Sequence, residues 1–181
     1  MTVNAASSLR RDAAANRARL IEAALDVFNA EGLEAGVEQI ARRAGVGVGT
    51  LYRRFPTKAA LIDFLVEALL VDMTEAAATA RSVPDGGGLE TFMRLIADQL
   101  SASRCCLPRL WADDTHDYSL LRRRISRLLR DAQQAGAVRG DVSRADITTI
   151  IWSLRGVVEC AGDDAARSCQ RHLDYVFAGM R

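Results

Sequence analysis

Residues 18–61 read ARLIEAALDVFNAEGLEAGVEQIARRAGVGVGTLYRRFPTKAAL, and this stretch decides the fold of the first third of the chain. Its apolar residues recur at helical spacing, beginning with a stripe that runs from Leu20 to Phe28. The stripe predicts a helix over residues 12–31. That helix is expected to end at Gly32, because glycine readily adopts the left-handed conformation that closes a helix.

Two short helices and a long one follow in the same stretch. The apolar spacing predicts a helix over residues 37–44, a turn at Gly45-Val46-Gly47 and a second short helix over residues 48–54. Pro56 cannot continue that helix, and Thr57 is a suitable N-cap for a long helix over residues 58–81. Two short helices joined by a glycine-containing turn, with a preceding helix to support them, form a helix-turn-helix unit.

The outward side chains of this unit suit a DNA duplex. With Leu51 and Phe55 turned inward, the second short helix and its exit present Val48, Thr50, Tyr52, Arg53 and Arg54. Threonine and arginine can bond base edges in the major groove, and tyrosine and arginine can bond phosphate oxygens. Lys58 lies in the first turn of the next helix, where free backbone N–H groups also favour an anion. The alternatives are that Tyr52 packs against the first helix and that Arg53 and Arg54 are a solvated pair.

The whole stretch resembles the DNA-binding domain of the tetracycline-repressor (TetR) family of bacterial one-component regulators. The matching motifs are A-x-x-x-F before an E-G stop, I-A-x-x-A-G-V before the turn, and G-T-L-Y-x-x-F-x-x-K at the end. The resemblance implies an N-terminal three-helix DNA-binding domain over residues 1–57, ordered from about residue 12. It further implies a helical effector-binding and dimerisation domain over residues 58–181, in which residues 58–81 are the connecting helix.

The resemblance also ranks the candidate DNA contacts. In that family the second helix of the motif enters the major groove, so Thr50, Tyr52 and Arg53 are the first candidates and Lys58 is expected on phosphate. Arg42 and Arg43 are weaker candidates, and Val48 offers only an apolar contact. Gly36 stands where the family often has Thr or Ser, and Gly47 with Val48 replaces a frequent Ser-x pair. Phosphate anchoring there is expected from backbone N–H groups or is lost.

Composition and charge agree with this assignment. The chain has 181 residues, of which 49% are hydrophobic and 26% charged, so it is expected to bury a core and is too short for a large multidomain enzyme. The net charge is only +1, but residues 1–58 carry nine Arg and Lys against six Asp and Glu. A phosphate-binding surface is therefore expected in the first third. Since no secretory signal or membrane-spanning stretch is evident, we expect a cytoplasmic protein without a membrane partner.

The remaining residues also have helical periodicity, so the predicted fold class is all-α. A loop over residues 82–88 is followed by expected helices at about 89–103 and 118–135. A further helix is expected to run to about residue 161, and a last one covers about residues 164–178. Ser143 and Asp146 resemble a capping box at the start of the first of these two helices.

The second domain is expected to hold an effector pocket between its helices, lined by apolar side chains and a few polar groups. The candidates are Met93, Ile96, Leu100, Trp111, Tyr118, Leu121, Ile125 and Trp152. The last two helices carry more apolar residues than one inward stripe needs, which predicts a two-fold dimer through a four-helix bundle. The candidates for that interface are Ile151, Leu154, Val158, Leu173, Val176 and Phe177.

These features predict a dimeric regulator, expected to be a repressor, that binds a palindromic operator and is released by a small-molecule effector of unknown identity. No enzymatic activity, cofactor or metal is expected. One alternative is a thiol-based redox or soft-metal sensor that uses Cys105 and Cys106, since vicinal thiols can react together. Another is a helical enzyme with one of these cysteines as nucleophile and His116 as base. The basic run between Arg122 and Arg130 is interpreted as a solvated face paired with Asp and Glu side chains.

Overall fold

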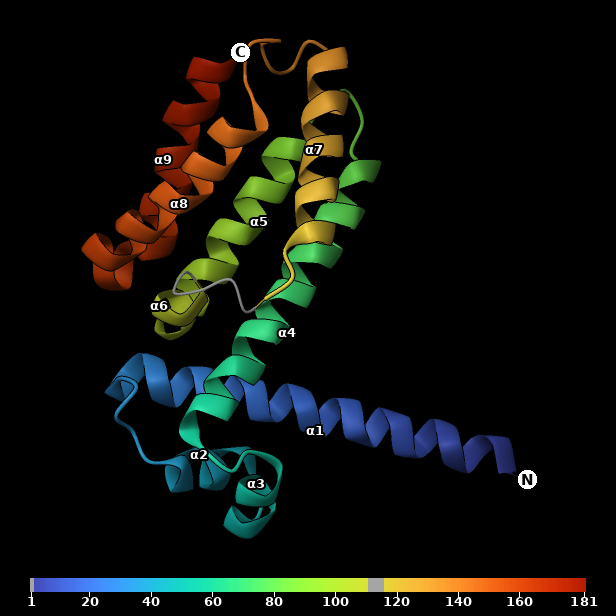
Figure 1. Cartoon of the computed structure of the whole chain (residues 1–181), viewed down its shortest axis with the longest axis vertical. Coiled ribbons are helices and arrows are strands. Elements are labelled where there is room, and N and C mark those ends of the chain that lie inside the picture. The colour runs from blue at the N-terminus through green and yellow to red at the C-terminus, as the bar shows by residue number, and fades with distance from the viewer. Residues whose placement is uncertain (1, 111–115) are drawn as a thin grey trace. The chain divides into compact units, whose positions relative to one another are not determined.

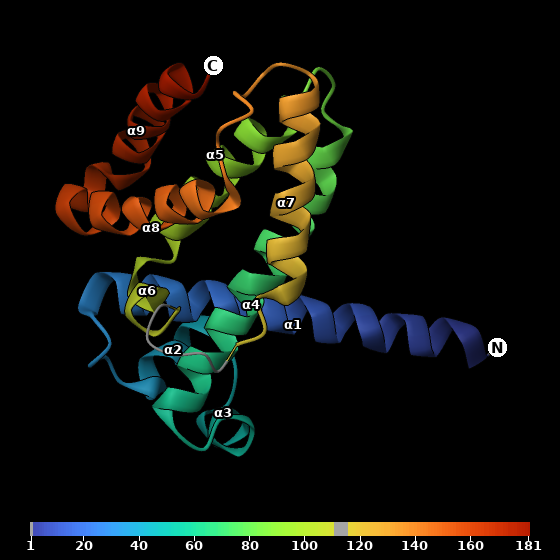
Figure 2. The same cartoon turned by 45° about the horizontal axis from the view of Figure 1, so that its top comes forward.

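The computed structural model describes residues 2–110 and 116–181 of the chain. Within those ranges every regular element is helical and no strand occurs, which confirms the predicted all-α class (Figures 1 and 2). The chain divides into two compact units, Met1–Leu65 and Val66–Arg181. The division falls inside helix α4 (Lys58–Thr79), whose first residue is the predicted start of the second domain. In the described ranges no helix is both long and apolar enough to cross a membrane.

The first unit is built on the predicted helix-turn-helix. It contains α1 (Thr2–Glu31), α2 (Val37–Ala44), α3 (Val48–Arg54) and the first residues of α4. Helix α1 begins well before the residue 12 expected from its apolar stripe. Helix α1 packs on α2, and α2 packs on α3. The core between them consists of buried apolar side chains, among which are Leu20, Ala24, Phe28, Ile40 and Leu51.

The turn and the start of α4 have the geometry that the sequence predicts. Gly45 follows α2 with φ 67° and ψ 30°, a left-handed conformation, and its N–H bonds the carbonyls of Ala41 and Arg42. Thr57 precedes α4, and its Oγ1 accepts a hydrogen bond of 3.1 Å from the N–H of Ala60. The predicted glycine turn at the end of α2 and the predicted threonine N-cap of α4 are both confirmed.

The second unit is a helical bundle arranged around α5 (Gly88–Ala102). It contains the rest of α4, the 3₁₀ turn η1 (Ala80–Ser82), η2 (Arg104–Cys106), α6 (Leu107–Leu110), α7 (Ser119–Gln134), α8 (Arg144–Ala161), η3 (Gly162–Asp164) and α9 (Ala165–Met180). Helix α5 packs against η1, α7, α8 and α9, and α8 packs along α9. Figures 1 and 2 show α5 between α7 on one side and the α8–α9 pair on the other. The buried side chains of α5, such as Phe92 and Ile96, therefore form the centre of this unit.

Polar contacts define the start of α8 and join α5 to α9. A capping box begins α8, as predicted: the Ser143 N–H donates to the Asp146 carboxylate at 2.7 Å, and the Asp146 N–H donates to Ser143 Oγ at 3.2 Å. The hydrogen bonds from Ser143 lower the pKa of Asp146. The Arg94 guanidinium bonds Glu90 of the same helix, α5, and Asp174 of α9, each at 2.7 Å, and the second bond joins the two helices.

Candidate DNA-binding surface and effector pocket

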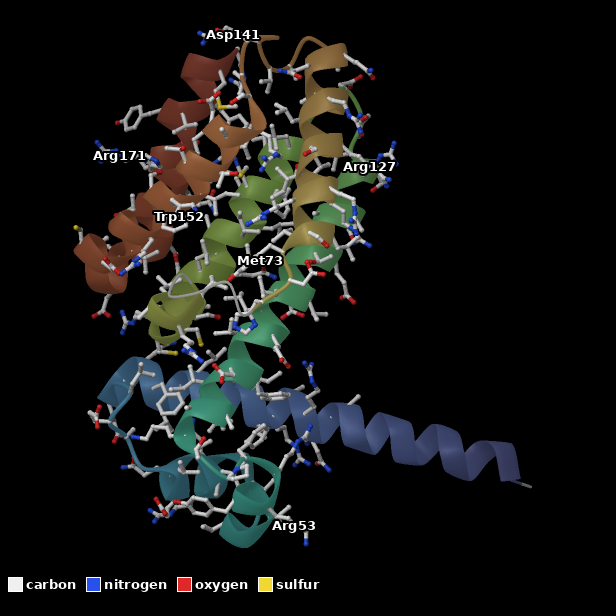
Figure 3. All side chains as sticks on the ribbon, in the orientation of Figure 1. Arg53, Met73, Arg127, Asp141, Trp152 and Arg171 are labelled. Carbon is white, nitrogen blue, oxygen red and sulfur yellow. The ribbon has the colours of Figure 1, made fainter. Side chains whose placement is uncertain are left out.

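Helix α3 turns an apolar side inward and a polar side outward. Leu51 is 2% exposed and Phe55 is also buried, while Tyr52 is 42% exposed. The other outward residues are Val48, Thr50, Arg53 and Arg54, and Figure 3 shows Arg53 extending away from the ribbon of α3. The structure thus places five of the eight side chains proposed for DNA contact on one exposed helix, whereas Arg42 and Arg43 lie on α2 and Lys58 begins α4. Their contact with DNA stays a prediction.

Tyr52 already has a partner within this unit. Its hydroxyl donates a hydrogen bond of 2.8 Å to the Glu38 carboxylate on α2. This bond raises the pKa of Tyr52, and a backbone hydrogen bond together with the Tyr52 hydroxyl lowers the pKa of Glu38. A phosphate contact by the Tyr52 hydroxyl would require it to exchange Glu38 for the phosphate. Glu38 was not among the residues predicted for the site.

The basic side chains of this unit fall into two groups. Arg43 Nε donates to Asp26 at 3.0 Å and so joins α2 to α1, while Lys58 Nζ donates to the Leu33 carbonyl at 2.8 Å and so joins the start of α4 to the turn between α1 and α2. Arg54 lies over the rings of Phe55 and Phe64, each with its guanidinium carbon 5.4 Å from the ring centroid. Arg42 and Arg53 differ from these: among the described residues neither forms an ion pair or a side-chain hydrogen bond. Arg53 therefore has its donors available to a ligand on the exposed side of α3.

The N-terminal ends of α2 and α3 lack side-chain caps. Gly36 and Gly47 occupy the N-cap positions in an extended conformation, and neither position has a side-chain hydrogen bond. The Gly47 carbonyl accepts the N–H groups of Thr50 and Leu51 at 2.9 and 3.0 Å. The departures from the family pattern noted in the sequence therefore leave each helix start without a hydroxyl side chain.

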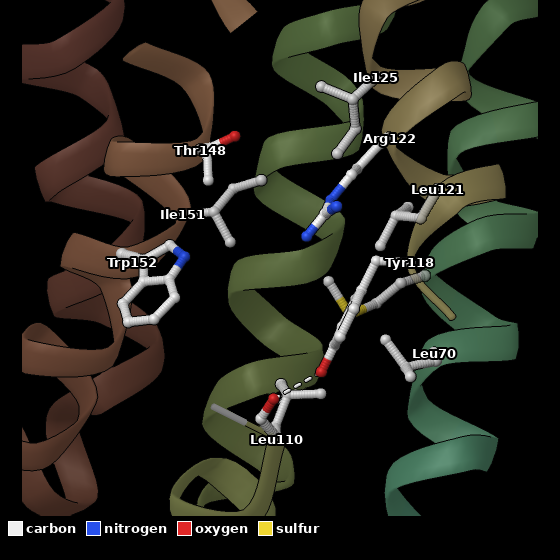
Figure 4. A pocket seen from close by; sticks show the side chains of 10 residues that line it. Leu70, Leu110, Tyr118, Leu121, Arg122, Ile125, Thr148, Ile151 and Trp152 are labelled. Carbon is white, nitrogen blue, oxygen red and sulfur yellow. Dashed lines mark hydrogen bonds between the residues drawn. The ribbon is translucent and has the colours of Figure 1, made fainter. Parts of the chain in front are cut away.

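The second unit contains a cavity of about 260 Å³ (Figure 4). Its walls come from α4, α6, α7 and α8 and from Tyr118 immediately before α7, and the lining residues are Leu70, Met73, Leu110, Tyr118, Leu121, Arg122, Ile125, Thr148, Ile151 and Trp152. Four of the predicted pocket residues lie on it, namely Tyr118, Leu121, Ile125 and Trp152. Three others, Met93, Ile96 and Leu100, are instead fully buried in the core along α5. Trp111 lies outside the described residues.

Three polar side chains reach this cavity from α7, α8 and the residue before α7. The Tyr118 hydroxyl donates to the Leu110 carbonyl at 2.6 Å, and Thr148 Oγ1 donates to the Arg144 carbonyl at 3.0 Å. The Arg122 guanidinium lies 5.7 Å from the centroid of the Tyr118 ring. Figure 4 shows it pointing into the cavity between Tyr118 and Ile151. The cavity therefore has largely apolar walls and one positively charged lining side chain, and it is open to solvent where Arg122 and Trp152 are exposed.

Most of the residues proposed for the dimer interface are buried within their own chain. Ile151, Leu154, Val158, Leu173 and Phe177 belong to the core, and Val176 is half-buried. Because α8 packs along α9 in the same subunit, these apolar stripes face each other there. The large apolar side chains of these helices that remain exposed are Trp152, at 50%, and Tyr175, at 65%.

The cysteine pair is placed for mutual contact. The sulfur atoms of Cys105 and Cys106 are 3.7 Å apart, and all four cysteines are free thiols. The hydrogen bond from Cys106 lowers the pKa of Cys105, whereas the same bond and burial raise the pKa of Cys106. No group of His, Cys, Asp and Glu in the described ranges is arranged to hold a metal ion. The sensor role of this pair stays an untested alternative.

The exposed helix α3 and the helical bundle with its cavity are together typical of a helix-turn-helix regulator. The profile described as "Bacterial regulatory proteins, tetR family" matches residues 20–64, and that described as "Transcriptional regulator SbtR-like, C-terminal domain" matches residues 56–181. The chain belongs to the TetR family of transcriptional regulators. Members of this family are DNA-binding regulators rather than enzymes.

Solved structures support the same assignment along nearly the whole chain. The chain is 34% identical to a TetR transcription regulatory protein from Mycobacterium vanbaalenii, over 96% of this chain and 99% of that one, with a TM-score of 0.70. It is 30% identical to a TetR transcriptional regulator from Streptomyces coelicolor, over 91% and 98% of the two chains, also with a TM-score of 0.70. An HTH-type transcriptional regulator of Staphylococcus aureus strain USA300 is 40% identical over 60 residues, which are 33% of this chain and 32% of that protein. The chain thus matches about a third of the length of such curated relatives.

Proposed function

We propose that this regulator is a repressor that binds a palindromic operator as a homodimer and leaves it when a small-molecule effector fills the cavity. The observation that carries the proposal is the exposed side of α3, where Thr50, Tyr52 and Arg53 project from a helix held by buried Leu51. A helix of this kind fits the major groove of DNA. Arg53 would read a base or a phosphate, and Lys58 would add a phosphate contact through the donors not used by Leu33.

The proposed dimer uses the exposed side of α8 and α9. Trp152 and Tyr175 are large, half-exposed or more, and lie on these two helices, while Val157 and Val176 are half-buried. Pairing these faces about a two-fold axis would remove them from water and place two copies of α3 on one DNA duplex. Two-fold symmetry of the protein requires an inverted repeat in the operator.

The proposed coupling runs through α4. This helix supplies Leu70 and Met73 to the cavity wall, and the same continuous helix carries Lys58 and Leu61 into the first unit. An effector shifts the equilibrium only if it binds the state that does not fit the operator more tightly. Typical coupling free energies of about 1–3 kcal/mol correspond to operator binding about 5- to 150-fold weaker.

The experiment is competitive DNA binding by the purified protein. The DNA is the intergenic region upstream of its own gene, measured against excess random DNA. We expect wild type to prefer the upstream DNA and Arg53→Ala to lose most of that preference. Arg127→Ala, which removes an exposed arginine from α7 in the second unit, is the matched control and should bind as wild type does. Equal binding of both DNAs by wild type, or full binding by Arg53→Ala, would contradict the proposal.

A further inference from the structure

We propose that the effector is an amphipathic organic anion whose apolar body fills the cavity and whose anionic group binds Arg122. This inference rests on the proposed function, since it names the chemical class of the effector that the repressor would sense. It is carried by the walls of the cavity, by the one charged side chain among its lining residues, and by the arginines of a depression that adjoins it at Arg122.

The apolar walls of the cavity favour a ligand that is largely apolar. Seven of the lining residues are Leu, Ile, Met or Trp, and they come from four helices that surround the space: Leu70, Met73, Leu110, Leu121, Ile125, Ile151 and Trp152. A ligand that fills about 260 Å³ against such walls gains from the burial of its apolar surface. A small inorganic anion would leave most of these walls wet, so the ligand must also carry a hydrocarbon or aromatic part.

Arg122 favours a ligand that carries a negatively charged group. The hydroxyl protons of Tyr118 and Thr148 are directed to backbone carbonyls. The Arg122 guanidinium, in contrast, forms no ion pair or hydrogen bond with any residue that the structure describes; it lies against the Tyr118 ring and points into the cavity (Figure 4). A neutral ligand would displace water from this guanidinium without replacing its hydrogen bonds, which is costly. A carboxylate, sulfonate or phosphate would accept two parallel N–H bonds from it.

The surroundings strengthen this preference. A second depression next to the cavity is lined by Arg122 together with further arginines of α7 and α8, which are Arg123, Arg127, Arg130 and Arg144. Within the described ranges none of these four forms an ion pair, but Asp117 is an acidic neighbour of the run: hydrogen bonds from Ser119, and after them the charges of Arg123 and Arg122, lower the pKa of its carboxyl. The nearby carboxylate of Asp117 accepts the Ser119 N–H at 2.8 Å. The surface depression that adjoins the cavity at Arg122 therefore carries an excess of positive charge, which attracts anions.

A pair of dyes with one aromatic skeleton tests the inference in the full-length protein. The anionic probe is 8-anilinonaphthalene-1-sulfonate, and the neutral probe is N-phenyl-1-naphthylamine, which lacks the sulfonate. Both become fluorescent in an apolar site, so each dissociation constant is obtained by titration. We expect wild type to bind the anionic dye at least about tenfold more tightly, since charge-assisted hydrogen bonds contribute about 1.5–3 kcal/mol and each 1.4 kcal/mol is tenfold.

Two substitutions test whether Arg122 causes the preference for the anionic dye. Arg122→Met keeps an unbranched apolar side chain and removes the charge, so the two dyes should then bind with similar affinity while the neutral dye binds as it does to wild type. Retained binding of the neutral dye also shows that the cavity has folded. Arg167→Met removes an equal charge from the exposed surface of α9, a helix that does not line the cavity, and it should keep the wild-type preference within about twofold because solvent screens distant charges.

Three results would overturn the inference: equal or tighter binding of the neutral dye by wild type, an unchanged preference in Arg122→Met, or no binding of either dye. Operator binding of each variant, measured without dye, separates this outcome from failure of the proposed function. If the preference for the anionic dye depends on Arg122 while wild type does not bind operator DNA, the anion site is supported and the repressor proposal fails.

Discussion

The glycine at the turn of the helix-turn-helix allows a prediction with a defined sign. Gly45 has φ 67° and ψ 30°, and a Cβ added there would meet no atom within 4 Å. The cost of Gly45→Ala is therefore conformational rather than steric. A left-handed L-residue costs about 1–2 kcal/mol, and the reduced freedom of the unfolded chain returns about 0.4–1 kcal/mol. We expect a net loss of about 1 kcal/mol in the free energy of unfolding.

Gly49→Ala is the matched control. Gly49 lies inside α3, and a Cβ there also meets nothing within 4 Å. Because alanine is favoured over glycine in a helix by about 1 kcal/mol, this substitution should stabilise the protein. The same chemical change thus has opposite signs four residues apart. Urea unfolding followed by far-UV circular dichroism measures both, and heating should shift the midpoint by about 2–4 °C per kcal/mol. Equal stability of Gly45→Ala and wild type would refute the assigned turn geometry.

Two other substitutions test the second unit. A Cβ at Gly88 would lie 2.5 Å from the Ala80 carbonyl oxygen, so Gly88→Ala should lower the free energy of unfolding by about 1–3 kcal/mol in thermal denaturation. Ser143→Ala removes the cap of α8 and should cost about 1 kcal/mol at neutral pH in urea denaturation. Because the bonds from Ser143 lower the pKa of Asp146 below its ordinary 3.8, their contribution is present above that pH and is lost as the pH falls through the folded-state pKa. The stability gap between wild type and Ser143→Ala should therefore narrow below about pH 4, and a constant gap down to pH 2 would contradict the capping box.

The helix-turn-helix could be predicted because its determinants are local. The stripe from Leu20 to Phe28, the stop at Gly45 and the cap at Thr57 each act within a few residues of chain. The inward position of Leu51 follows from the same periodicity. The partners of outward side chains are different, since the Tyr52–Glu38 bond joins two helices and depends on how they cross.

The cavity could be predicted only in part because its walls come from separate helices. Tyr118 immediately precedes α7 and Ile125 lies on it. Because α7 is strongly amphipathic, both residues could be predicted for the cavity. Leu70 and Met73 belong to the apolar side of α4, where periodicity cannot distinguish a side chain that faces a cavity from one that faces a neighbour.

The same limitation explains the proposed dimer residues. Residues such as Leu154 and Leu173 lie on helices with apolar residues beyond one stripe, and this excess was assigned to a partner subunit. In the structure α8 contacts α5, α7 and α9, so several neighbours within the subunit cover it. The number of neighbours around a helix is a property of the tertiary fold, and helical periodicity alone does not contain it.

The most direct test of specific DNA recognition by α3 is selection of binding sites from a random DNA library by the purified protein. We predict enrichment of an inverted repeat whose half-sites have centres about one helical turn, or a multiple of it, apart. Arg53→Ala, selected in parallel, should lose that enrichment. The absence of any enriched sequence with wild type, or the same repeat enriched equally by Arg53→Ala, would contradict the claim that this helix reads an operator.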